Sequence, residues 1–202
     1  MPVYSFENFV PVVHPTAYVH PTAVLIGDVI IGAGVYVGPG ASLRGDFGTV
    51  SLEEGSNIQD NCVMHSFPGA EARVEVNGHI GHGAILHGCI VKRNALVGMN
   101  AVVMDRAIVG EDAFVAASSF VKASFEIPPR MLAAGIPAKI LRPITDQELE
   151  WKIQGTIEYQ NLTKQSRASL RECAPLPAVE PNRPQRTGGY APLTDLKRSS
   201  SS

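Results

Sequence analysis

The sequence predicts an all-β fold in which a short unit repeats and stacks on itself, followed by one helical segment. An aliphatic residue returns at every sixth position over most of the chain, and the fifth position of each unit is also small or apolar. A helix buries residues with a period of 3.6 and a long strand with a period of two, so neither explains two buried positions in every six. A stack of short strands does explain them.

The repeats form two regular runs that are separated by a less regular middle. The aliphatic positions are Val13, Val19, Leu25, Ile31, Val37 and Leu43, and then Val91, Val97, Val103, Val109, Val115 and Val121. The fifth positions are Ala17, Ala23, Val29, Val35 and Ala41, and then Ala95, Ala101, Ala107, Ala113 and Ser119. Because both runs have the same period, we expect a single stacked domain.

Units such as IGAGVY at 31–36 and VGMNAV at 97–102 resemble the hexapeptide repeat of the left-handed parallel β-helix. The resemblance covers residues 11–141 and implies a triangular prism with three units per coil. In that fold the first residue of each unit fills the interior, and the glycine and asparagine positions turn the corners. We therefore expect a lead-in strand at 1–12 and an all-β left-handed parallel β-helix at 13–141.

Beyond the prism the sequence changes first to a helical pattern and then to a tail. Thr145 and Glu148 have the spacing of a capping box, and we expect a C-terminal helix at 142–173. We expect Gly155 to weaken or kink this helix, and Trp151 and Tyr159 to pack along a prism face or a neighbouring subunit. Its recurring apolar positions are Leu149, Ile153, Ile157, Leu162 and Leu170. Prolines and a terminal serine run predict an extended tail at 174–202, disordered at its end.

Composition excludes several classes of function. The 202 residues carry a net charge of -2 and are 45% hydrophobic, which gives no sign of nucleic-acid binding. No apolar run is long enough to cross a membrane, and the first ten residues lack the layout of a signal peptide, so the expected location is cytoplasmic. The three cysteines follow no pattern, and we interpret Cys62 and Cys89 as buried, inert thiols.

Interruptions of the six-residue register are the first candidates for a functional site. A packed prism must place surplus residues in loops at its corners, and loops often carry function. Three surplus residues lie between Leu43 and Leu52, and four lie between Met64 and Val74, which predicts a loop near 66–69. One residue is missing between Leu86 and Val91.

Counting units across these interruptions relates three histidines to one another. Every third unit lies on the same face, so the units that start at 43, 64, 86 and 103 form one column. His65 and His87 then stack on one face, about 4.8 Å apart. His82 belongs to the neighbouring column and points about one corner away. Two prisms side by side could unite the three histidines, and three such contacts predict a homotrimer with a ligand site at each interface.

Three histidines are a recognised ligand set for zinc, so His65, His82 and His87 are the candidate metal ligands. Three neutral imidazoles leave a position open for water and lower its pKa to about 7. Zn²⁺ is therefore the expected cofactor, with Fe²⁺ or Co²⁺ as alternatives. We interpret His14 and His20 as ordinary surface residues, and we expect His79 in a loop or at a corner.

Short motifs around these histidines resemble the γ-class carbonic anhydrases: LRGD at 43–46, NIQDN at 57–61, MH at 64–65, GH at 81–82 and LHG at 86–88. The resemblance implies a homotrimer with a metal at each subunit interface. It also implies the site residues: the ligands His65, His82 and His87, surrounded by Arg44, Asp46, Gln59 and Asp60. The chain has no counterpart of the acidic loop that carries the proton-shuttle glutamate in the prototypical enzymes.

Four polar residues near the histidines have expected roles. Arg44 and Asp46 lie on the same side of a strand, where we expect a structural ion pair beside the metal. Asp60 can accept an N–H from a ligand histidine, and Gln59 can orient a water and contact the substrate. No residue is assigned to binding the rest of the substrate.

Over nearly the whole chain, segments such as VHPTAVLIGDVI and ELEWK most closely resemble the phenylacetate-degradation branch of this family, with the carnitine-metabolism branch as its sister. This resemblance implies a metal-dependent thioesterase, in which metal-bound hydroxide attacks acyl-CoA esters such as 2-hydroxyphenylacetyl-CoA. The alternatives are a γ-class carbonic anhydrase, a hexapeptide acyltransferase with a histidine as general base, and a non-catalytic trimeric binding protein. The expected partner is an acyl-CoA, with no nucleic acid and no membrane.

Overall fold

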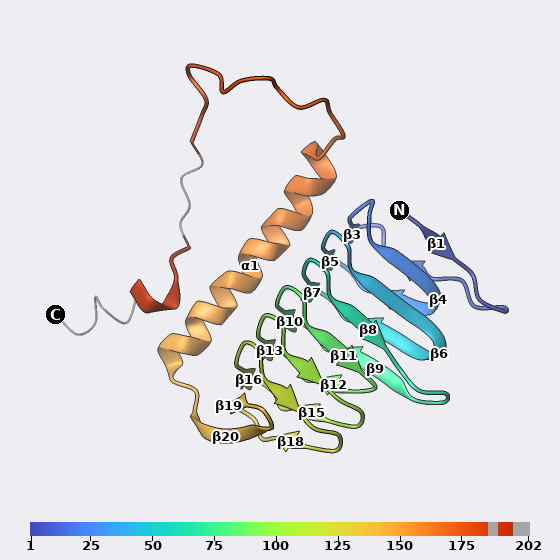
Figure 1. Ribbon diagram of the computed structural model, residues 1–202, viewed down its shortest axis with the longest axis vertical. Coiled ribbons are helices and arrows are strands. Elements are labelled where there is room, and N and C mark those ends of the chain that lie inside the picture. Colours follow the sequence, from blue (N-terminus) through green and yellow to red (C-terminus); the bar gives the residue numbers. More distant parts are fainter. Residues whose placement is uncertain (186–189, 196–202) are drawn as a thin grey trace.

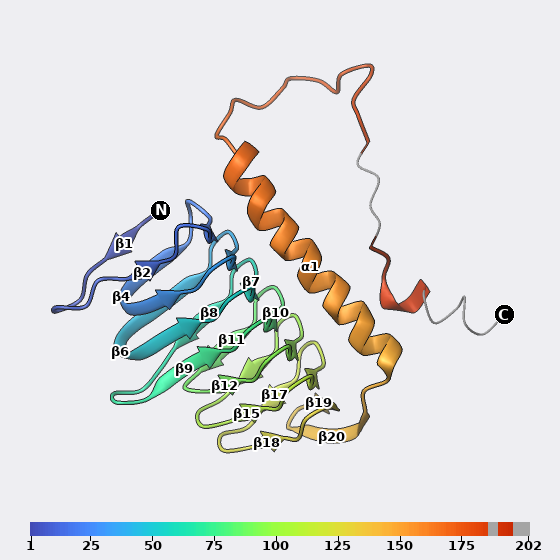
Figure 2. The same ribbon diagram turned by 180° about the vertical axis from the view of Figure 1, so that it is seen from behind.

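The computed structural model describes residues 1–185 and 190–195 and confirms the predicted fold class. The chain forms a left-handed parallel β-helix with the helix α1 (Asp146–Ser169) beside it (Figure 1, Figure 2). Strands that are stacked on one another make up three faces of a prism, and the inward residues are fully buried from β4 onward in most strands. Within the described residues, no helix is long and apolar enough to cross a membrane.

The first and second faces belong to one twelve-stranded sheet, because two long strands, β4 (Val24–Ile31) and β6 (Ser42–Leu52), bend from one face to the other. The first face also holds β1 (Val3–Tyr4), β8 (Val63–His65), β11 (Ile85–His87), β14 (Val102–Val103) and β17 (Phe120–Val121). The second face holds β2 (Val12–Val13), β9 (Glu71–Val74), β12 (Ile90–Val91), β15 (Ile108–Val109) and β18 (Glu126–Ile127).

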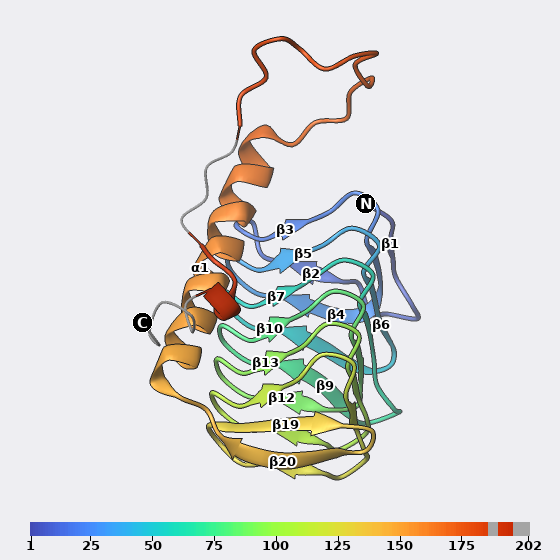
Figure 3. The same cartoon turned by 60° about the vertical axis from the view of Figure 1, so that its left-hand side comes forward.

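The third face is an eight-stranded sheet that α1 borders (Figure 3). Its strands are β3 (Tyr18–Val19), β5 (Tyr36–Val37), β7 (Asn57–Ile58), β10 (His79–Ile80), β13 (Leu96–Val97), β16 (Phe114–Val115), β19 (Met131–Gly135) and β20 (Ala138–Pro143). The pairing of β19 with β20 is antiparallel and ends the stack, and the chain then enters α1.

The register of the strands confirms the columns that unit counting predicts. On the first face, Leu43 pairs with Met64, Met64 with Leu86, and Leu86 with Val103. On the third face, the same holds for Val37, Ile58, Ile80 and Val97. Each of these side chains is fully buried. A slip of one residue would turn all of them outward, so their burial fixes the register.

The two interruptions of the register differ in structure. The surplus residues after Met64 form the predicted loop, with a turn at Pro68 and Gly69. The surplus between Leu43 and Leu52 does not form a loop, so this prediction is wrong. These residues stay within β6, whose pairing with β4 shifts register beyond Gly27. The bulge accommodates the extra length without breaking the strand, because β6 is paired on both sides.

The corners between faces hold residues with positive φ, as the repeat implies. Asn61, Asn77, Asn94 and Asn100 all have φ between 55° and 59°. Most L-residues are strained in this left-handed region, whereas asparagine tolerates it and glycine is free of strain there. The asparagines in the repeat are therefore explained by backbone geometry at the corners.

Replacement of Asn100 tests the strain at one corner. Its φ is 56° and its side chain is exposed, so Asn100→Ala is expected to lower the free energy of unfolding by about 1 kcal/mol through backbone strain. Asn100→Gly is expected to cost less, because glycine adopts this conformation freely. Urea denaturation of both variants measures the difference. An equal loss in the two would assign the effect to the asparagine side chain instead.

The helix α1 begins with the predicted capping box, since Thr145 Oγ1 accepts from the Glu148 amide and the Glu148 carboxylate accepts from the Thr145 amide. The helix is continuous through Gly155, so the expected kink is wrong. The buried side of the helix is largely polar: Glu148, Lys152, Gly155, Thr156, Thr163 and Ser166. Its apolar residues Ile153 and Ile157 are each 38% exposed, which leaves an apolar stripe on the outer side.

The polar side of α1 matches the polar edge of the prism. Lys152 Nζ donates to the Asn77 carbonyl oxygen, and Gln160 Nε2 donates to the Gly55 carbonyl oxygen. The corners expose backbone oxygens that need donors when a helix covers them. Side chains that donate hydrogen bonds therefore replace the apolar contact face that most surface helices present.

Two remaining predictions concern the cysteines and the tail. Cys62 and Cys89 are buried, as predicted, and burial raises the pKa of Cys62 to about 11 and that of Cys89 to about 12. Residues 190–195 return to α1, where the Ala191 carbonyl oxygen accepts from Trp151 Nε1. The predicted disorder at the end of the tail concerns 196–202, which lie outside the described residues.

Candidate histidine site

The first part of the site is a pair of stacked histidines at the ends of β8 and β11. His65 and His87 are direct partners in the strand register, which confirms their predicted stacking. Their ring centroids are 5.1 Å apart, and His65 Nδ1 lies 3.1 Å from His87 Nε2. Two bare lone pairs would repel each other at this distance, so one of these nitrogens carries the hydrogen of a hydrogen bond.

A carboxylate holds the outer nitrogen of each stacked histidine. His65 Nε2 lies 2.9 Å from Asp46 Oδ1, and His87 Nδ1 lies 2.5 Å from Asp105 Oδ1. The result is a continuous line of hydrogen bonds from Asp46 through both rings to Asp105. The carboxylates fix the orientation of both rings and direct the two remaining nitrogens at each other.

Arg44 completes this end of the site and confirms the predicted ion pair. Its Nε donates to Asp46 Oδ2 over 3.2 Å, and its Nη2 lies 3.4 Å from His65 Nε2. Burial acts to raise the pKa of Asp46, but the hydrogen bond from His65 and the charge of Arg44 outweigh it and hold this pKa below its usual value. Asp46 is therefore ionised at neutral pH.

His82 lies at the corner between the third and first faces, apart from the stacked pair. Its Nδ1 donates to Asp60 Oδ2 over 2.7 Å, which is the contact that we predicted for Asp60. Its Nε2 lies 3.4 Å from Tyr159 Oη on α1, and the side chain is 48% exposed. In the described part of one chain, no three histidine, cysteine or acidic side chains are placed to hold a metal together.

The stacked pair nevertheless fits two positions of a metal centre. In a tetrahedral zinc site with Zn–N distances of about 2.0–2.1 Å, neighbouring nitrogens are about 3.4 Å apart. The nitrogens of His65 and His87 are 3.1 Å apart, and carboxylates anchor the far side of both rings as in many metal sites. The third histidine of the predicted set would come from another copy of the chain.

Gln59 does not lie beside the stacked histidines, but in a buried network under α1. Its Nε2 donates to Asn57 Oδ1 over 3.0 Å and lies 2.8 Å from His79 Nε2. Only 3% of Gln59 is exposed. The amide is therefore held by the protein itself, although it forms part of the wall of a cavity next to His82.

His79 is not a loop or corner residue, and that expectation is wrong. It lies on β10 beneath α1, where its Nδ1 is 3.3 Å from Thr156 Oγ1 and its ring packs edge-on against Tyr159. Burial, together with the charges of Lys152 and His82, lowers the pKa of His79 to about 3, so it is neutral. The sequence predicts the helix α1, but not that it covers the strand on which His79 lies.

The sequence also gave no role to Asp105 or to two phenylalanines beside the stacked pair. Phe47 lies 5.4 Å from His65 and Phe67 lies 5.0 Å from His87, measured between ring centroids. Both come from the interrupted segments, and both are about half exposed. Asp105 could have been found, because the column that carries His87 continues at Val103, two residues before it.

An apolar cavity of about 510 Å³ lies between the third face and α1, with His82 at its edge. Its lining includes Gly81, Gly98, Ala116 and Phe114 from the prism, and Gly155 and Tyr159 from the helix. The cavity exists because the outward positions of successive coils are glycine or alanine at this point. Its volume lies in the range of small-molecule pockets.

Residues 11–45 match the family described as bacterial transferase hexapeptide, six repeats. The chain is 60% identical to the carnitine operon protein CaiE of Citrobacter koseri, over 93% of this chain and 95% of that protein. The chain belongs to the CaiE family. CaiE of Salmonella newport is 58% identical over 98% of both chains.

Two solved structures with this fold are named as transferases or as members of a transferase family. A hexapeptide transferase family protein from Anaplasma phagocytophilum is 36% identical, with a TM-score of 0.78 over 81% of this chain and 96% of that one. The product of the BC4754 gene of Bacillus cereus, which has a provisional name as an acetyltransferase, is 30% identical, with a TM-score of 0.81 over 82% and 96%. These likenesses place the CaiE family among the hexapeptide-repeat transferases.

These relatives belong to the carnitine-metabolism branch, which the sequence analysis treats as the sister of the phenylacetate-degradation branch. Their name is that of carnitine metabolism, whereas the closer resemblance was to the phenylacetate-degradation branch. That resemblance and the one to the γ-class carbonic anhydrases stay predictions. What the comparisons add is a likeness to hexapeptide transferases, over residues 11–45 for the family model and over 81% of the chain for the Anaplasma phagocytophilum structure.

Proposed function

We propose that this protein is an enzyme that transfers the acyl group of a coenzyme A thioester to an acceptor, with His82 as the general base. The observation that carries the proposal is the pair His82 and Asp60 at the edge of an apolar cavity. The transferase family and the names of the related structures support it. The sequence analysis gives acyl transfer as an alternative to metal-dependent hydrolysis, and we place acyl transfer first.

The geometry suits proton removal at one atom. Because His82 Nδ1 donates its hydrogen to Asp60, Nε2 keeps its lone pair, which faces Tyr159 Oη at 3.4 Å and can accept a proton when an acceptor displaces that hydroxyl. The acceptor, an alcohol or an amine, loses a proton to Nε2 as it attacks the thioester carbonyl carbon. The C–S bond then breaks, and the departing thiolate of coenzyme A takes the proton from His82. Asp60 stabilises the charged imidazole between the two steps.

Metal-dependent hydrolysis of the thioester is the second candidate, and the stacked pair favours it. His65 and His87 of one subunit would hold the ion together with His82 of a neighbour, which is the ligand set predicted from the sequence. When bound, Zn²⁺, Fe²⁺ or Co²⁺ supplies Lewis-acid chemistry at a carbonyl or water oxygen. Asp46, Asp105 and Asp60 would orient the three rings.

A homotrimer is part of this second candidate. His82 is one corner away from the stacked pair, so a second copy must approach the first face to bring the three together. Val63 and Ile85 on that face are 39% and 40% exposed, which provides apolar surface for such an approach. Light scattering is expected to give three times the chain mass of 21.6 kDa, and a monomer would rule out the shared metal site.

One assay separates the candidates. Purified protein is incubated with acyl-CoA esters, including acetyl-CoA and 2-hydroxyphenylacetyl-CoA, with and without an amine or alcohol acceptor, after chelation or after reconstitution with zinc. For acyl transfer, we expect acylated acceptor to form faster than free acid and to survive chelation. Free acid alone, lost on chelation, would establish the hydrolase instead. If no ester reacts, the zinc-loaded sample is tested for CO₂ hydration, and inactivity there supports a binding protein.

A further inference from the structure

We propose that the apolar cavity beneath α1 binds the acyl group of the thioester, and that Tyr190 is the wall that limits the size of this group. The inference rests on the proposed function, which supplies the class of ligand. It adds a binding site and a specificity-determining residue that lies more than a hundred positions from His82 in the sequence.

The cavity is suited to an apolar group attached to a reacting carbonyl. Its lining is mainly apolar, and His82 at its edge presents the nitrogen that we assign to proton transfer. Gly81 and Gly98 line it without side chains, and the stacking of the coils requires this, since a Cβ at either position would lie within 2.7 Å of a backbone nitrogen of the next coil. A thioester carbonyl placed near His82 would therefore direct its apolar substituent under α1.

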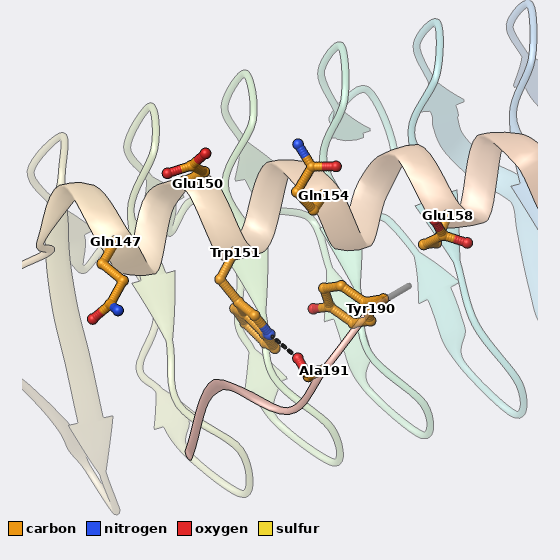
Figure 4. A pocket seen from close by; sticks show the side chains of 7 residues that line it. All are labelled: Gln147, Glu150, Trp151, Gln154, Glu158, Tyr190 and Ala191. Atoms are coloured by element: carbon orange, nitrogen blue, oxygen red, sulfur yellow. Dashed lines mark hydrogen bonds between the residues drawn. The ribbon is translucent and has the colours of Figure 1, made fainter. Parts of the chain in front are cut away.

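Tyr190 closes this cavity on the side of the C-terminal segment. Its ring stacks on Trp151, with 5.7 Å between centroids and 23° between planes. The next residue is fixed too, because Trp151 Nε1 donates to the Ala191 carbonyl oxygen over 3.1 Å (Figure 4). Burial raises the pKa of Tyr190 to about 12, in agreement with a phenol that is partly removed from water.

Gly155 provides independent support for this placement of Tyr190. Glycine destabilises the interior of a helix relative to alanine, and yet Gly155 lies in the middle of α1. A Cβ at this position would lie 2.7 Å from Tyr190 Oη and 3.1 Å from Cζ. The absence of a side chain is therefore what allows the tyrosine to approach the helix at this turn.

Tyr190 also lies between the apolar cavity and a second hollow of mixed polarity. A groove of about 360 Å³ lies between α1 and the C-terminal segment, and Gln147, Glu150, Gln154, Trp151 and Tyr190 are among the residues that line it (Figure 4). Tyr190 and Trp151 line both spaces. Removal of the tyrosine ring would join the cavity to the groove and admit a longer acyl group.

Calorimetric titration of the full chain with acetyl-, hexanoyl- and decanoyl-CoA, and with free coenzyme A, tests the proposal. Tyr190→Ala is expected to raise the affinity ratio of decanoyl-CoA to acetyl-CoA by about tenfold or more, because each added methylene gains space in which to be buried. Tyr190→Phe retains the ring and is expected to keep the wild-type ratio. Tyr4→Ala, an exposed tyrosine on β1, serves as the matched control.

Fluorescence gives a second readout, because Trp151 is the only tryptophan of the chain. We expect its emission to shift as hexanoyl-CoA enters the cavity, and to change without ligand in Tyr190→Ala and in Gly155→Ala. An unchanged affinity ratio in Tyr190→Ala, or equal binding of all esters and free coenzyme A to the wild type, would overturn the inference. Selective binding without any turnover would instead retain the acyl site and reject the proposed enzyme.

Discussion

His82→Ala is expected to lower kcat/KM for an acyl-CoA substrate by about 10²–10⁴-fold, the usual contribution of a positioned acid or base. The ring is the only group at the edge of the apolar cavity to which we assign proton transfer, and Asp60 already holds it in the required tautomer. The side chain is 48% exposed, so its loss should leave the fold intact. Steady-state kinetics, with circular dichroism as a check of folding, measure the effect.

Companion variants make this expectation specific. His20→Ala removes a histidine that contacts Thr22 on the surface and is expected to keep full activity. Asp60→Asn keeps the shape of the side chain but weakens its hold on His82, so a loss of about tenfold or more is expected. Full activity in His82→Ala would exclude both candidate reactions, because His82 takes part in each.

His87→Ala distinguishes between the two reactions. If His82 is the general base of acyl transfer, the His87 ring lies away from the proton that His82 moves. The loss of this ring is then expected to have a modest effect on kcat/KM. In metal-dependent hydrolysis it is a ligand, and its loss should abolish both activity and stoichiometric binding of zinc. Metal analysis of the purified variant, beside its kinetics, decides between the two outcomes.

The register of the prism could be predicted from sequence because the repeat is strictly local. Each coil adds the same inward residues, so counting units was enough to stack His65 on His87 and to separate His82 from them. The same counting failed at β6, where the extra residues bulge within a paired strand. A surplus in the count indicates an interruption but not whether it becomes a loop or a bulge.

Contacts with α1 could not be predicted in the same way. The recurring apolar residues Ile153 and Ile157 suggest the usual apolar contact face, but they point outward. The prism edge is lined with backbone oxygens, and the helix meets it with Lys152 and Gln160. The buried state of His79 and the cavity beside His82 both follow from this docking, so they remained hidden in the sequence.

Lys152→Ala is expected to lower the free energy of unfolding by about 2–4 kcal/mol, because it empties a buried site and leaves polar groups without a donor. Lys152 is 1% exposed, and its Nζ donates to the Asn77 carbonyl oxygen and to Asn94 Oδ1, each over 2.6 Å. These bonds join α1 to two successive corners. Lys164→Ala, an exposed lysine on the same helix, is the control and should cost little.

The same lysine makes stability depend on pH in a predictable direction. Burial lowers the pKa of Lys152 to about 7; the charge of Asp112 opposes this and that of Arg93 adds to it. The unfolded chain keeps the ordinary lysine pKa of about 10.4, so between these values it binds the proton that the folded state has lost. The free energy of unfolding should therefore rise as the pH increases from about 7 to 10, whereas below about pH 7 both states hold the proton and Lys152 adds no further pH dependence.

Lys152→Met isolates this contribution, since methionine has similar length and does not titrate. Urea denaturation at pH 7 and pH 9 is expected to show that the wild type gains about 1–2 kcal/mol more than Lys152→Met over this interval. Parallel profiles would mean that Lys152 stays protonated in the folded state, held as a cation by the oxygens of Asn77 and Asn94. The attachment of α1, and with it the roof of the cavity, would then be insensitive to alkaline pH.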